Sequence, residues 1–355
     1  MSMIRPADEI DLAEVLRGGA RPYYVLGGGT RRILPEEGEA IDTSALTGMR
    51  IYEPGSLTLV ARAGTPLVEV EALLAEQRQR LAFEVPDLRG LLGRAGVSTL
   101  GGVAATNASG PRRVQVGACR DQVLGLRFVN GAGVVVKAGG RVMKNVTGLD
   151  ISKLLVGSHG RLGVMTELAF RVQAVPEAVL TLVGQRDLAS GLTALRAALG
   201  SPMDVSGAAY QRGQAMIRIE GMAGSVAYRA EALRTRLGGA WDMVSGAGPW
   251  AAIRDVTAFA GRPGNVWRVS VKPSDALGVV EGLAAEAIFD WGGGLIWLMA
   301  DGALDVRAKL ANRGHATLMR GQGTVFPPVF PPEAPAIAAL TAGLRAKFDP
   351  KGIFR

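Results

Sequence analysis

Apolar residues recur at helical spacing in two segments near the start of the chain. Residues 8–19, "DEIDLAEVLRGG", place apolar side chains on one face and end in two glycines, which is typical of a helix end. Residues 65–80, "TPLVEVEALLAEQRQR", show the same spacing. In this second helix we expect Thr65 to be the N-cap residue and Pro66 to be the first helical residue.

Segments with strand character lie between and after these helices. Residues 22–30, "PYYVLGGGT", predict a strand that runs into a glycine loop, and residues 50–65 predict two strands around a Pro-Gly turn. Residues 122–140 predict a hairpin, because Asn130-Gly131 is the dipeptide most typical of a tight hairpin turn. We therefore expect short helices and short strands to alternate in the first half of the chain.

The pattern changes around residues 173–176. Beyond this point a strand–helix–strand rhythm repeats about twice, which predicts a split βαβ sandwich. The rhythm is compatible with an internal duplication, although the two parts share no convincing sequence similarity. Residues 274–287 are expected to form one helix of this part. After an extended, proline-rich stretch at 325–335, a last helix is expected to end at Asp349-Pro350.

The composition fits a folded protein with more than one domain. Of the 355 residues, 48% are hydrophobic and 20% are charged, so a sizeable core can be buried. The net charge of +8 comes from scattered Arg and Lys, without the basic block of a nucleic-acid-binding arm. The single cysteine, Cys119, excludes an internal disulfide and a cysteine-rich iron–sulfur site, and it favours a cytoplasmic protein. No segment reaches the roughly 18 apolar residues of a membrane span.

The first of three glycine-rich loops is the segment Gly27 to Thr30, which follows a predicted strand. Consecutive glycines allow backbone N–H groups to converge on phosphate oxygens. The loop departs from the dinucleotide fingerprint because Arg32 stands where the last glycine is required, and no phosphate-loop lysine follows. Taken alone, the loop is weak evidence for a phosphate site, and a tight turn is the favoured interpretation.

The second loop is residues 98–113, "STLGGVAATNASGPRR", and the third is residues 157–168, "GSHGRLGVMTEL". Small residues in the second loop would let the backbone lie close to a ligand, whereas a small-residue helix packed on a neighbour is the alternative. The third loop has a glycine every three residues, and a turn before a buried strand is its alternative. Together, three such loops favour a long, flat, anionic cofactor such as FAD.

The order of these motifs resembles the FAD-binding domain of vanillyl-alcohol oxidase type (PCMH-type) flavoproteins. The resemblance covers about residues 1–174 and includes "VLGGGT", "PDLRGLLG" and "VMKNVTGLDISKLLVGSHGRLGVMTEL". The rest of the chain, including "RGHATLMRG" and "FDPKGIF", resembles the small FAD-binding E subunits of bacterial glycolate oxidase (glycolate dehydrogenase). The implied fold is α+β: an FAD-binding domain of two subdomains over 1–174, a cap over 175–314, and a C-terminal segment, 315–355, that packs back near the FAD domain.

The resemblance also implies which residues line the cofactor. Some relatives attach FAD covalently through His or Cys, but the first loop has neither and Cys119 follows the second loop, so we expect non-covalent FAD. A side chain added at Gly101 or Gly102 is expected to prevent FAD retention. Lys144, Gly148 and Asp150 lie in a segment usual in the family, without assigned contacts. The residues assigned to FAD are Gly27, Gly28, Gly29, Thr30, Pro86, Thr99, Leu100, Gly101, Gly102, Thr106, Asn107, Ser109, Gly110, Gly163, Val164 and Thr166.

Oxidation of a 2-hydroxy acid by a flavin needs a base for the hydroxyl proton and a cation for the carboxylate. His159 and His315 are too few for a histidine-rich metal site, so no metal is expected. His159 lies in the third loop and is expected to be a turn residue, which leaves His315 as the catalytic histidine. Arg113 is taken as the carboxylate holder, although nothing in the sequence separates it from Arg112 and Arg320.

Three interpretations of function remain open. In the first, the chain is the FAD-carrying subunit of a glycolate-oxidising complex, whose partners are a larger flavin subunit and an iron–sulfur subunit. In the second, it is a self-sufficient FAD-dependent oxidoreductase of a small 2-hydroxy acid or alcohol. In the third, it is a non-enzymatic subunit with an FAD-binding fold. Its expected location is the cytoplasm. The complex is either free there or attached peripherally to the inner membrane.

Overall fold

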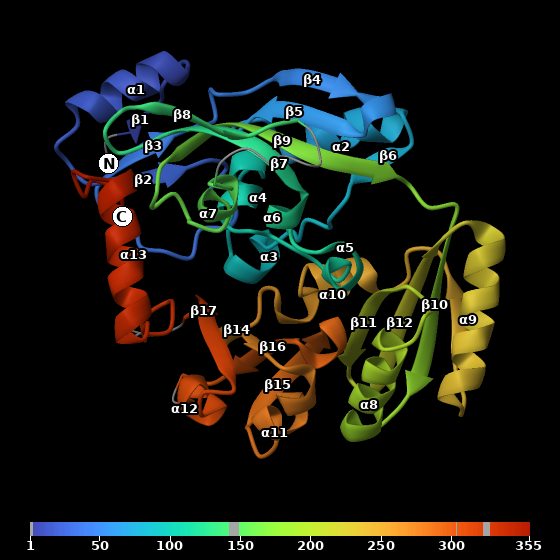
Figure 1. The fold of residues 1–355 in the computed structure, drawn as a ribbon. Helices are drawn as coiled ribbons and strands as arrows, with labels where there is room; N and C mark the ends of the chain where they lie inside the picture. Colours follow the sequence, from blue (N-terminus) through green and yellow to red (C-terminus); the bar gives the residue numbers. More distant parts are fainter. Residues whose placement is uncertain (1–2, 142–148, 303, 322–326) are drawn as a thin grey trace.

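The computed structural model describes residues 3–141, 149–302, 304–321 and 327–355. Figure 1 shows two bodies, one above the other, with the C-terminal helix standing beside both. The upper, N-terminal body ends with strand β9 (Val164–Ala174), and the lower body begins with β10 (Ala178–Gln185). Only three residues connect β9 to β10, so the chain passes directly from one body to the other.

A small parallel sheet with the order β1-β3-β2 opens the N-terminal body, and α1 packs beside it. Helix α1 begins where the sequence predicts, because the Asp8 carboxylate accepts hydrogen bonds from the backbone N–H groups of Ile10 and Asp11. Its apolar face, which includes Leu12 and Leu16, is fully buried. The elements are β1 (Met3–Ile4), α1 (Glu9–Gly18), β2 (Tyr23–Leu26) and β3 (Glu39–Asp42).

A larger antiparallel sheet completes this body, with the described strands in the order β4-β5-β9-β7-β8 and β6 paired to the end of β9. Helices α2 and α4 share one core with it, in which Leu74, Leu100 and Phe170 are fully buried. The elements are β4 (Met49–Glu53), η1 (Pro54–Ser56), β5 (Thr58–Arg62), α2 (Leu67–Glu76), β6 (Gln79–Leu81), α3 (Arg89–Leu92), α4 (Leu100–Ala105), α5 (Arg113–Val116), α6 (Cys119–Gln122), β7 (Val123–Val129), β8 (Val135–Gly139) and α7 (Ser152–Leu155).

The lower body is built on one sheet, whose described strands have the order β13-β10-β12-β11-β15-β16-β14-β17. Its two halves follow the same path, since in each the fourth strand lies beside the first and the third lies beside the second. They join where β11 meets β15, at Tyr210 and Phe289. The predicted rhythm is thus a repeated topology. The elements are α8 (Leu188–Leu199), β11 (Val205–Gln211), β12 (Gln214–Gly221), α9 (Ala223–Leu237), β13 (Asp242–Ser245), α10 (Trp250–Arg254), η2 (Thr257–Phe259), β14 (Asn265–Val271), η3 (Pro273–Asp275), α11 (Ala276–Val280), β15 (Ala285–Asp290), η4 (Trp291–Gly293), β16 (Leu295–Ala300), α12 (Val306–Leu310) and β17 (Gly314–Arg320).

The two faces of this cap sheet have different partners. One face is covered by the cap's own helices α8, α9, α11 and α12, which share a core with the strands. The other face meets the N-terminal body, because Val266, Ile288 and Trp297 share a core with Leu88 and Leu91. The cap sheet therefore closes the underside of the N-terminal body, as Figure 1 shows.

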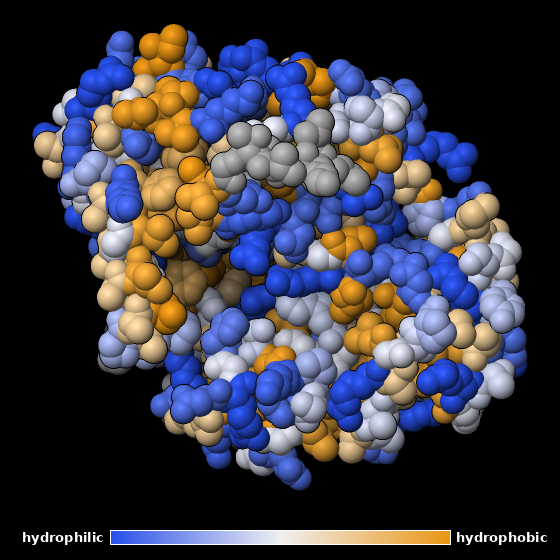
Figure 2. All heavy atoms as spheres, viewed as in Figure 1, coloured by the Kyte–Doolittle hydropathy of each residue, from blue (hydrophilic) through white to orange (hydrophobic). Residues whose placement is uncertain are grey.

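The tail returns to the N-terminal body through helix α13 (Pro335–Phe348). The Phe348 ring stacks on Phe128 with 5.9 Å between ring centroids, and Phe354 forms a bridge beside Tyr23. Strand β17, in contrast, pairs with β14 in the cap sheet, so the segment expected to begin at residue 315 starts inside the cap. In Figure 2 apolar side chains gather along the α13 side, where exposed apolar side chains include Ile337, Leu340 and Leu344.

The α+β class is confirmed, but local predictions fail in two places where distant strands pair. Pro66, and not Thr65, is the N-cap of α2, because the chain there pairs with the segment around Thr99 and Leu67 donates to the Ser98 carbonyl. Thr65 instead hydrogen-bonds Gly48.

The helix predicted over residues 274–287 covers only α11, which ends at Val280. Gly282 then takes a positive φ of 73°, and the following residues form β15, paired to β16 along its whole length. The hairpin of β7 and β8 is present, but its connection is a five-residue loop in which the Asn130 side chain accepts hydrogen bonds from Ala132 and Val134.

Candidate functional site

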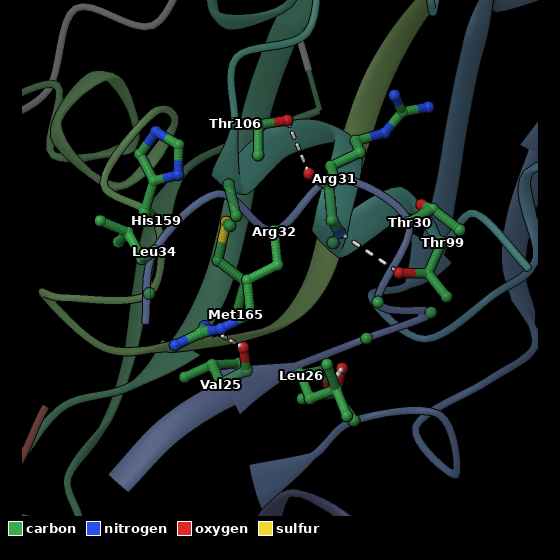
Figure 3. A pocket seen from close by; sticks show the side chains of 18 of the residues that line it. Val25, Leu26, Thr30, Arg31, Arg32, Leu34, Thr99, Thr106, His159 and Met165 are labelled. Atoms are coloured by element: carbon green, nitrogen blue, oxygen red, sulfur yellow. Dashed lines mark hydrogen bonds between the residues drawn. The ribbon is translucent and has the colours of Figure 1, made fainter. Parts of the chain in front are cut away.

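A half-open cavity, whose empty volume including space open to solvent is about 720 Å³, lies in the N-terminal body where the three glycine-rich loops meet. Figure 3 shows side chains from these loops around it. Nine of the sixteen residues assigned to the cofactor line it. These are Gly27, Gly28, Gly29, Thr30, Thr99, Gly101, Gly102, Thr106 and Gly163.

The first glycine loop is packed on one side and open on the other. A Cβ at Gly28 would lie 1.5 Å from the Val97 carbonyl oxygen, so glycine is required where two backbones touch. Gly29 has a φ of 69°, and a Cβ there would meet only the Leu26 side chain, at 3.7 Å. The loop is therefore more than a tight turn, because its open side faces the cavity.

Arg31 brings a buried cation to this cavity. Its side chain donates to the Pro86 carbonyl and, over 2.9 Å, to the Ser98 hydroxyl, while its Nε has no hydrogen-bond partner among the described residues. Burial lowers the pKa of Arg31 to about 10, so the guanidinium stays charged at neutral pH. The carboxylates of Asp87 and Asp255 act on this charge, and the unused Nε leaves one buried donor that favours a further acceptor such as an anionic ligand. Arg32 stacks on Tyr24, 4.4 Å from the ring centroid.

The second loop contains the short helix α4, so the helix alternative is correct for residues 100–105. Thr99 caps it by accepting a hydrogen bond from the Gly102 N–H at 3.3 Å. Gly101 packs on Ala63, whose backbone oxygen would lie 3.0 Å from a Cβ. Gly102 is open, because a Cβ there would meet only the Thr99 hydroxyl, at 3.3 Å. Its added side chain, unlike that of Gly101, would enter the cavity.

Beyond Thr106 the second loop turns away from the cavity. The Asn107 amide oxygen accepts a hydrogen bond from Arg120, and the Ser109 hydroxyl accepts one from Cys119. Gly110 lies against the cap, where its carbonyl accepts a hydrogen bond from the Trp291 indole at 3.1 Å. These three assigned residues therefore shape the neighbouring turn and the domain boundary.

Two other assigned residues, Leu100 and Val164, are fully buried in the hydrophobic cores. Thr166 is also buried, and its hydroxyl donates to Glu9 at 2.5 Å. Gly163 is the member of the third loop's strand start that reaches the cavity. Lys144 and Gly148 lie outside the described residues, whereas Asp150 accepts a hydrogen bond from the Ser152 hydroxyl.

His159 is a turn residue, as predicted, and it also lines the cavity, which the sequence did not indicate. Its φ is 55°, and its ring meets Phe330 of the tail edge-on with 5.3 Å between centroids. Burial lowers its pKa to about 4, so the imidazole is neutral at pH 7. Cys119 is fully buried, and burial raises the pKa of its thiol, which leaves it an inert core residue.

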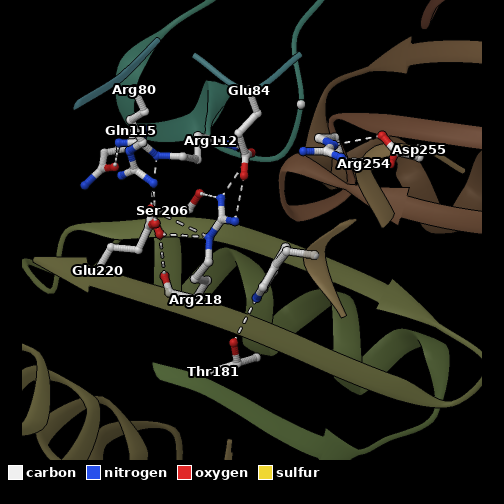
Figure 4. A network of polar contacts seen from close by, with 12 residues as sticks. Arg80, Glu84, Arg112, Gln115, Thr181, Ser206, Arg218, Glu220, Arg254 and Asp255 are labelled. Atoms are coloured by element: carbon white, nitrogen blue, oxygen red, sulfur yellow. Dashed lines mark hydrogen bonds and ion pairs between the residues drawn. The ribbon is translucent and has the colours of Figure 1, made fainter. Parts of the chain in front are cut away.

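The boundary between the two bodies carries a network of ion pairs (Figure 4). Arg112 pairs with Glu220 of the cap at 3.0 Å, and Arg218 of the cap pairs with Glu84 at 2.8 Å. Arg112 is therefore not available to a substrate carboxylate. Arg320 is also engaged, since its guanidinium donates to four backbone carbonyls, with the two shortest distances at 2.7 Å.

Arg113 and His315 lie near two residues, Trp291 and Arg268, that the sequence did not single out. The Arg113 guanidinium lies over the Trp291 ring, 4.8 Å from its centroid, and Arg268 lies over the same ring at 5.3 Å. His315 stands on β17, opposite Ser270 of β14, and its pKa is lowered by partial burial and by the charge of Arg268. Trp291 and Arg268 carry no motif, so only the fold identifies them.

No helix among the described residues is long and apolar enough to cross a membrane. Within the same residues, no group of three or more His, Cys, Asp or Glu side chains is arranged to hold a metal ion.

Comparisons with known proteins agree on the nature of the chain. Residues 2–139 match the family model described as FAD binding domain. Glycolate oxidase subunit GlcE of Escherichia coli K12 is 36% identical over 94% of this chain and 91% of its own length. The mitochondrial D-lactate dehydrogenase [cytochrome] of Arabidopsis thaliana is 29% identical over 49% of this chain and 30% of its own length.

A solved structure of alkyldihydroxyacetonephosphate synthase matches with a TM-score of 0.68 and 16% identity. The match covers 99% of this chain and 75% of that chain, and it shows a shared fold. The full-length similarity to subunit GlcE establishes a closer relationship. The chain therefore belongs to the family of glycolate oxidase subunit GlcE and carries an FAD-binding domain in its N-terminal half.

Proposed function

We propose that this protein is the FAD-carrying subunit of a complex that oxidises glycolate or a similar small 2-hydroxy acid. The observation that carries the proposal is the 720 Å³ cavity, in which three glycine-rich loops and the buried Arg31 converge. The E. coli relative is a subunit of glycolate oxidase, which supports both the substrate class and the membership of a complex.

The residues present fit an elongated anionic cofactor. Gly29 and Gly102 leave room on the cavity side where any other residue would add a side chain. The unused Nε donor of Arg31 calls for an anion, and the backbone of the first glycine loop would hold the pyrophosphate with it. A second hollow, of about 850 Å³ including space open to solvent, is lined by glycines of the first loop and by Thr99 of the second. FAD would thus be held from Gly27 to Arg31 and along α4.

The chemistry that FAD supplies when bound is two-electron oxidation and reduction. The protein's own residues bind and enclose it. Arg31 provides a fixed positive charge, and neutral His159 closes one wall together with Phe330 of the tail. The cap sheet keeps water from the boundary through the core around Trp297. We propose non-covalent attachment, because the Cys119 thiol is sealed in the core.

The proposed partners are a larger flavin subunit and an iron–sulfur subunit, with the complex in the cytoplasm or attached to the inner membrane at its surface. A second candidate function is self-sufficient oxidation of a hydroxy acid. The observation that favours it is the gathering of Arg113, Arg268 and His315 around one boundary, where a substrate carboxylate and hydroxyl could be held.

The test starts from the purified chain. Its absorption between about 350 and 500 nm reports flavin, and acid precipitation reports whether that flavin is released. Glycolate is then added without oxygen, first to the chain alone and then to the chain with its larger flavin subunit. We expect releasable flavin that is reduced only with the partner present. Reduction of the isolated chain would favour the self-sufficient enzyme, and a colourless chain that takes up no FAD would refute the proposal.

A further inference from the structure

A group of polar side chains interrupts the apolar face of the cap sheet that meets the N-terminal body. Strands β14 and β17 pair so that Arg268 faces Thr317 and Ser270 faces His315. Residues two apart on a strand share a face, so these four side chains lie on the face to which Val266 belongs. Val266 packs in the boundary core, whereas Arg268, Ser270 and Thr317 are half-buried and His315 is exposed, so the polar group lies where this face opens to solvent and a small molecule can enter.

Close to this group, two guanidinium groups lie over the same indole ring. Arg113, from the N-terminal body, lies 4.8 Å from the Trp291 ring centroid, and Arg268, from the cap, lies 5.3 Å from it. Trp291 is fixed in place, since its indole donates to the Gly110 carbonyl at 3.1 Å. The arrangement therefore brings one cation from each body to the same indole ring.

Neither of these two arginine side chains has a hydrogen-bond acceptor or a carboxylate partner within the part of the chain that the structure describes. Other boundary arginines are paired: Arg112 with Glu220, and Arg218 with Glu84. The boundary thus pairs its structural cations directly, whereas Arg113 and Arg268 are influenced by the carboxyls of Asp121 and Asp290 without forming an ion pair with either among the described residues. A partly buried cation without a partner is costly, which favours an anion supplied from outside.

Asp290, the carboxyl that raises the pKa of Arg268, forms no ion pair with it among the described residues. The side chain of Asp290 accepts a hydrogen bond from the Trp291 backbone at 2.7 Å, and burial raises its pKa to about 7. The pKa of Arg268 is lowered to about 10, by burial first and by the charge of Arg113 second. Arg268 therefore stays charged at neutral pH, close to a second cation, Arg113.

We propose that Arg113, Arg268 and Trp291 form a binding site, between the two bodies, for the carboxylate of a small organic acid. Guanidinium groups bind carboxylates through paired hydrogen bonds, and the indole ring holds both groups in position. His315 and Thr317 supply further polar groups at the edge of the site. The identity of the acid as a 2-hydroxy acid rests on the proposed function, whereas the site itself does not.

The experiment is calorimetric titration of the FAD-loaded protein with oxalate, a small dicarboxylate that carries no hydroxyl to oxidise. The wild type is expected to bind it, and Arg268→Met and Arg113→Met are each expected to bind at least 10-fold more weakly. Arg268→Lys keeps the charge but loses the paired donors, so its affinity for oxalate should lie between that of the wild type and that of Arg268→Met. The matched control is Arg186→Met, which removes an arginine stacked on Trp241 elsewhere in the cap.

Flavin absorbance and the thermal midpoint are recorded for every variant. Retained flavin with lost oxalate binding supports the site, whereas lost flavin would instead bear on the FAD proposal. Absence of oxalate binding by the wild type, or equal binding by the Met variants and the control, would overturn the inference. If oxalate does not bind but Arg268→Met no longer binds the purified larger flavin subunit, the cations serve an acidic partner surface and the small-acid site is refuted.

Discussion

Replacement of Glu84 by Gln tests whether the ion network holds the two bodies together. Glu84 lies in the N-terminal body and accepts two hydrogen bonds from Arg218 of the cap, at 2.8 and 3.2 Å, and one from the Arg112 backbone at 2.7 Å. Glutamine has nearly the same shape but presents an NH₂ group toward donors and carries no charge. The Arg218 side chain, which is only 5% exposed, would then lose its main counter-charge.

Breaking a buried ion pair by removing one partner costs about 3–5 kcal/mol. We expect the lower end, about 3 kcal/mol, because the Glu84 side chain is 17% exposed and Arg218 keeps hydrogen bonds to Ser206. Urea unfolding of the FAD-loaded protein, followed by circular dichroism and by tryptophan fluorescence, measures the loss. If the cap separates from the N-terminal body before that body unfolds, the transitions followed by circular dichroism and by tryptophan fluorescence would occur at different urea concentrations.

The matched control is Glu231→Gln, the same substitution in an exposed pair with Arg234 on helix α9, where the two side chains are 2.8 Å apart. No measurable loss is expected there, because solvent already stabilises both charges. A loss in Glu84→Gln no larger than in this control would refute the view that the network stabilises domain docking.

Three further predictions follow from single residues. Burial raises the pKa of Asp290 to about 7, so the fold favours its protonated form, and this stabilisation is complete below about pH 4 and lost as the pH rises through 7. Asp290→Asn should therefore flatten the pH dependence of urea unfolding between pH 4 and 8, and an unchanged profile would contradict this. Phe354→Ala should cost about 3 kcal/mol, because the ring is buried beside Tyr23, and an unchanged urea midpoint would show that the tail is not anchored there. Arg31→Met should weaken FAD binding at least 10-fold in equilibrium dialysis, and full affinity would exclude Arg31 from the cofactor site.

Local patterns predicted the elements whose residues depend mainly on their neighbours in sequence. Helix α1 is an example, since its cap residue Asp8 and its apolar face are both encoded within one segment. The N-cap of α2 and the extent of α11 were missed because long-range pairing decides them: Pro66 pairs with Thr99, and β15 replaces the end of the expected helix. Local helix propensity is overridden where pairing with a strand supplies hydrogen bonds to the backbone.

The candidate site divides in the same way. Glycine loops could be identified from sequence because the residue type itself carries the information, although the different roles of Gly101 and Gly102 depend on which neighbour each Cβ would meet. Arg112 and Arg113 are adjacent and chemically identical, yet one is paired with Glu220 and the other lies over Trp291. No sequence pattern separates them, because their partners come from the cap, more than a hundred residues away.

The most direct test of the central claim is the FAD affinity of Gly102→Val, measured by equilibrium dialysis with the thermal midpoint of the FAD-free protein as a check on folding. The matched control is Gly224→Val, an exposed helical glycine on α9 with open space around it. If the cavity beside α4 holds FAD, Gly102→Val loses at least 100-fold in affinity while the control binds as the wild type does. Undiminished binding by a folded Gly102→Val protein would contradict the placement of FAD in this cavity.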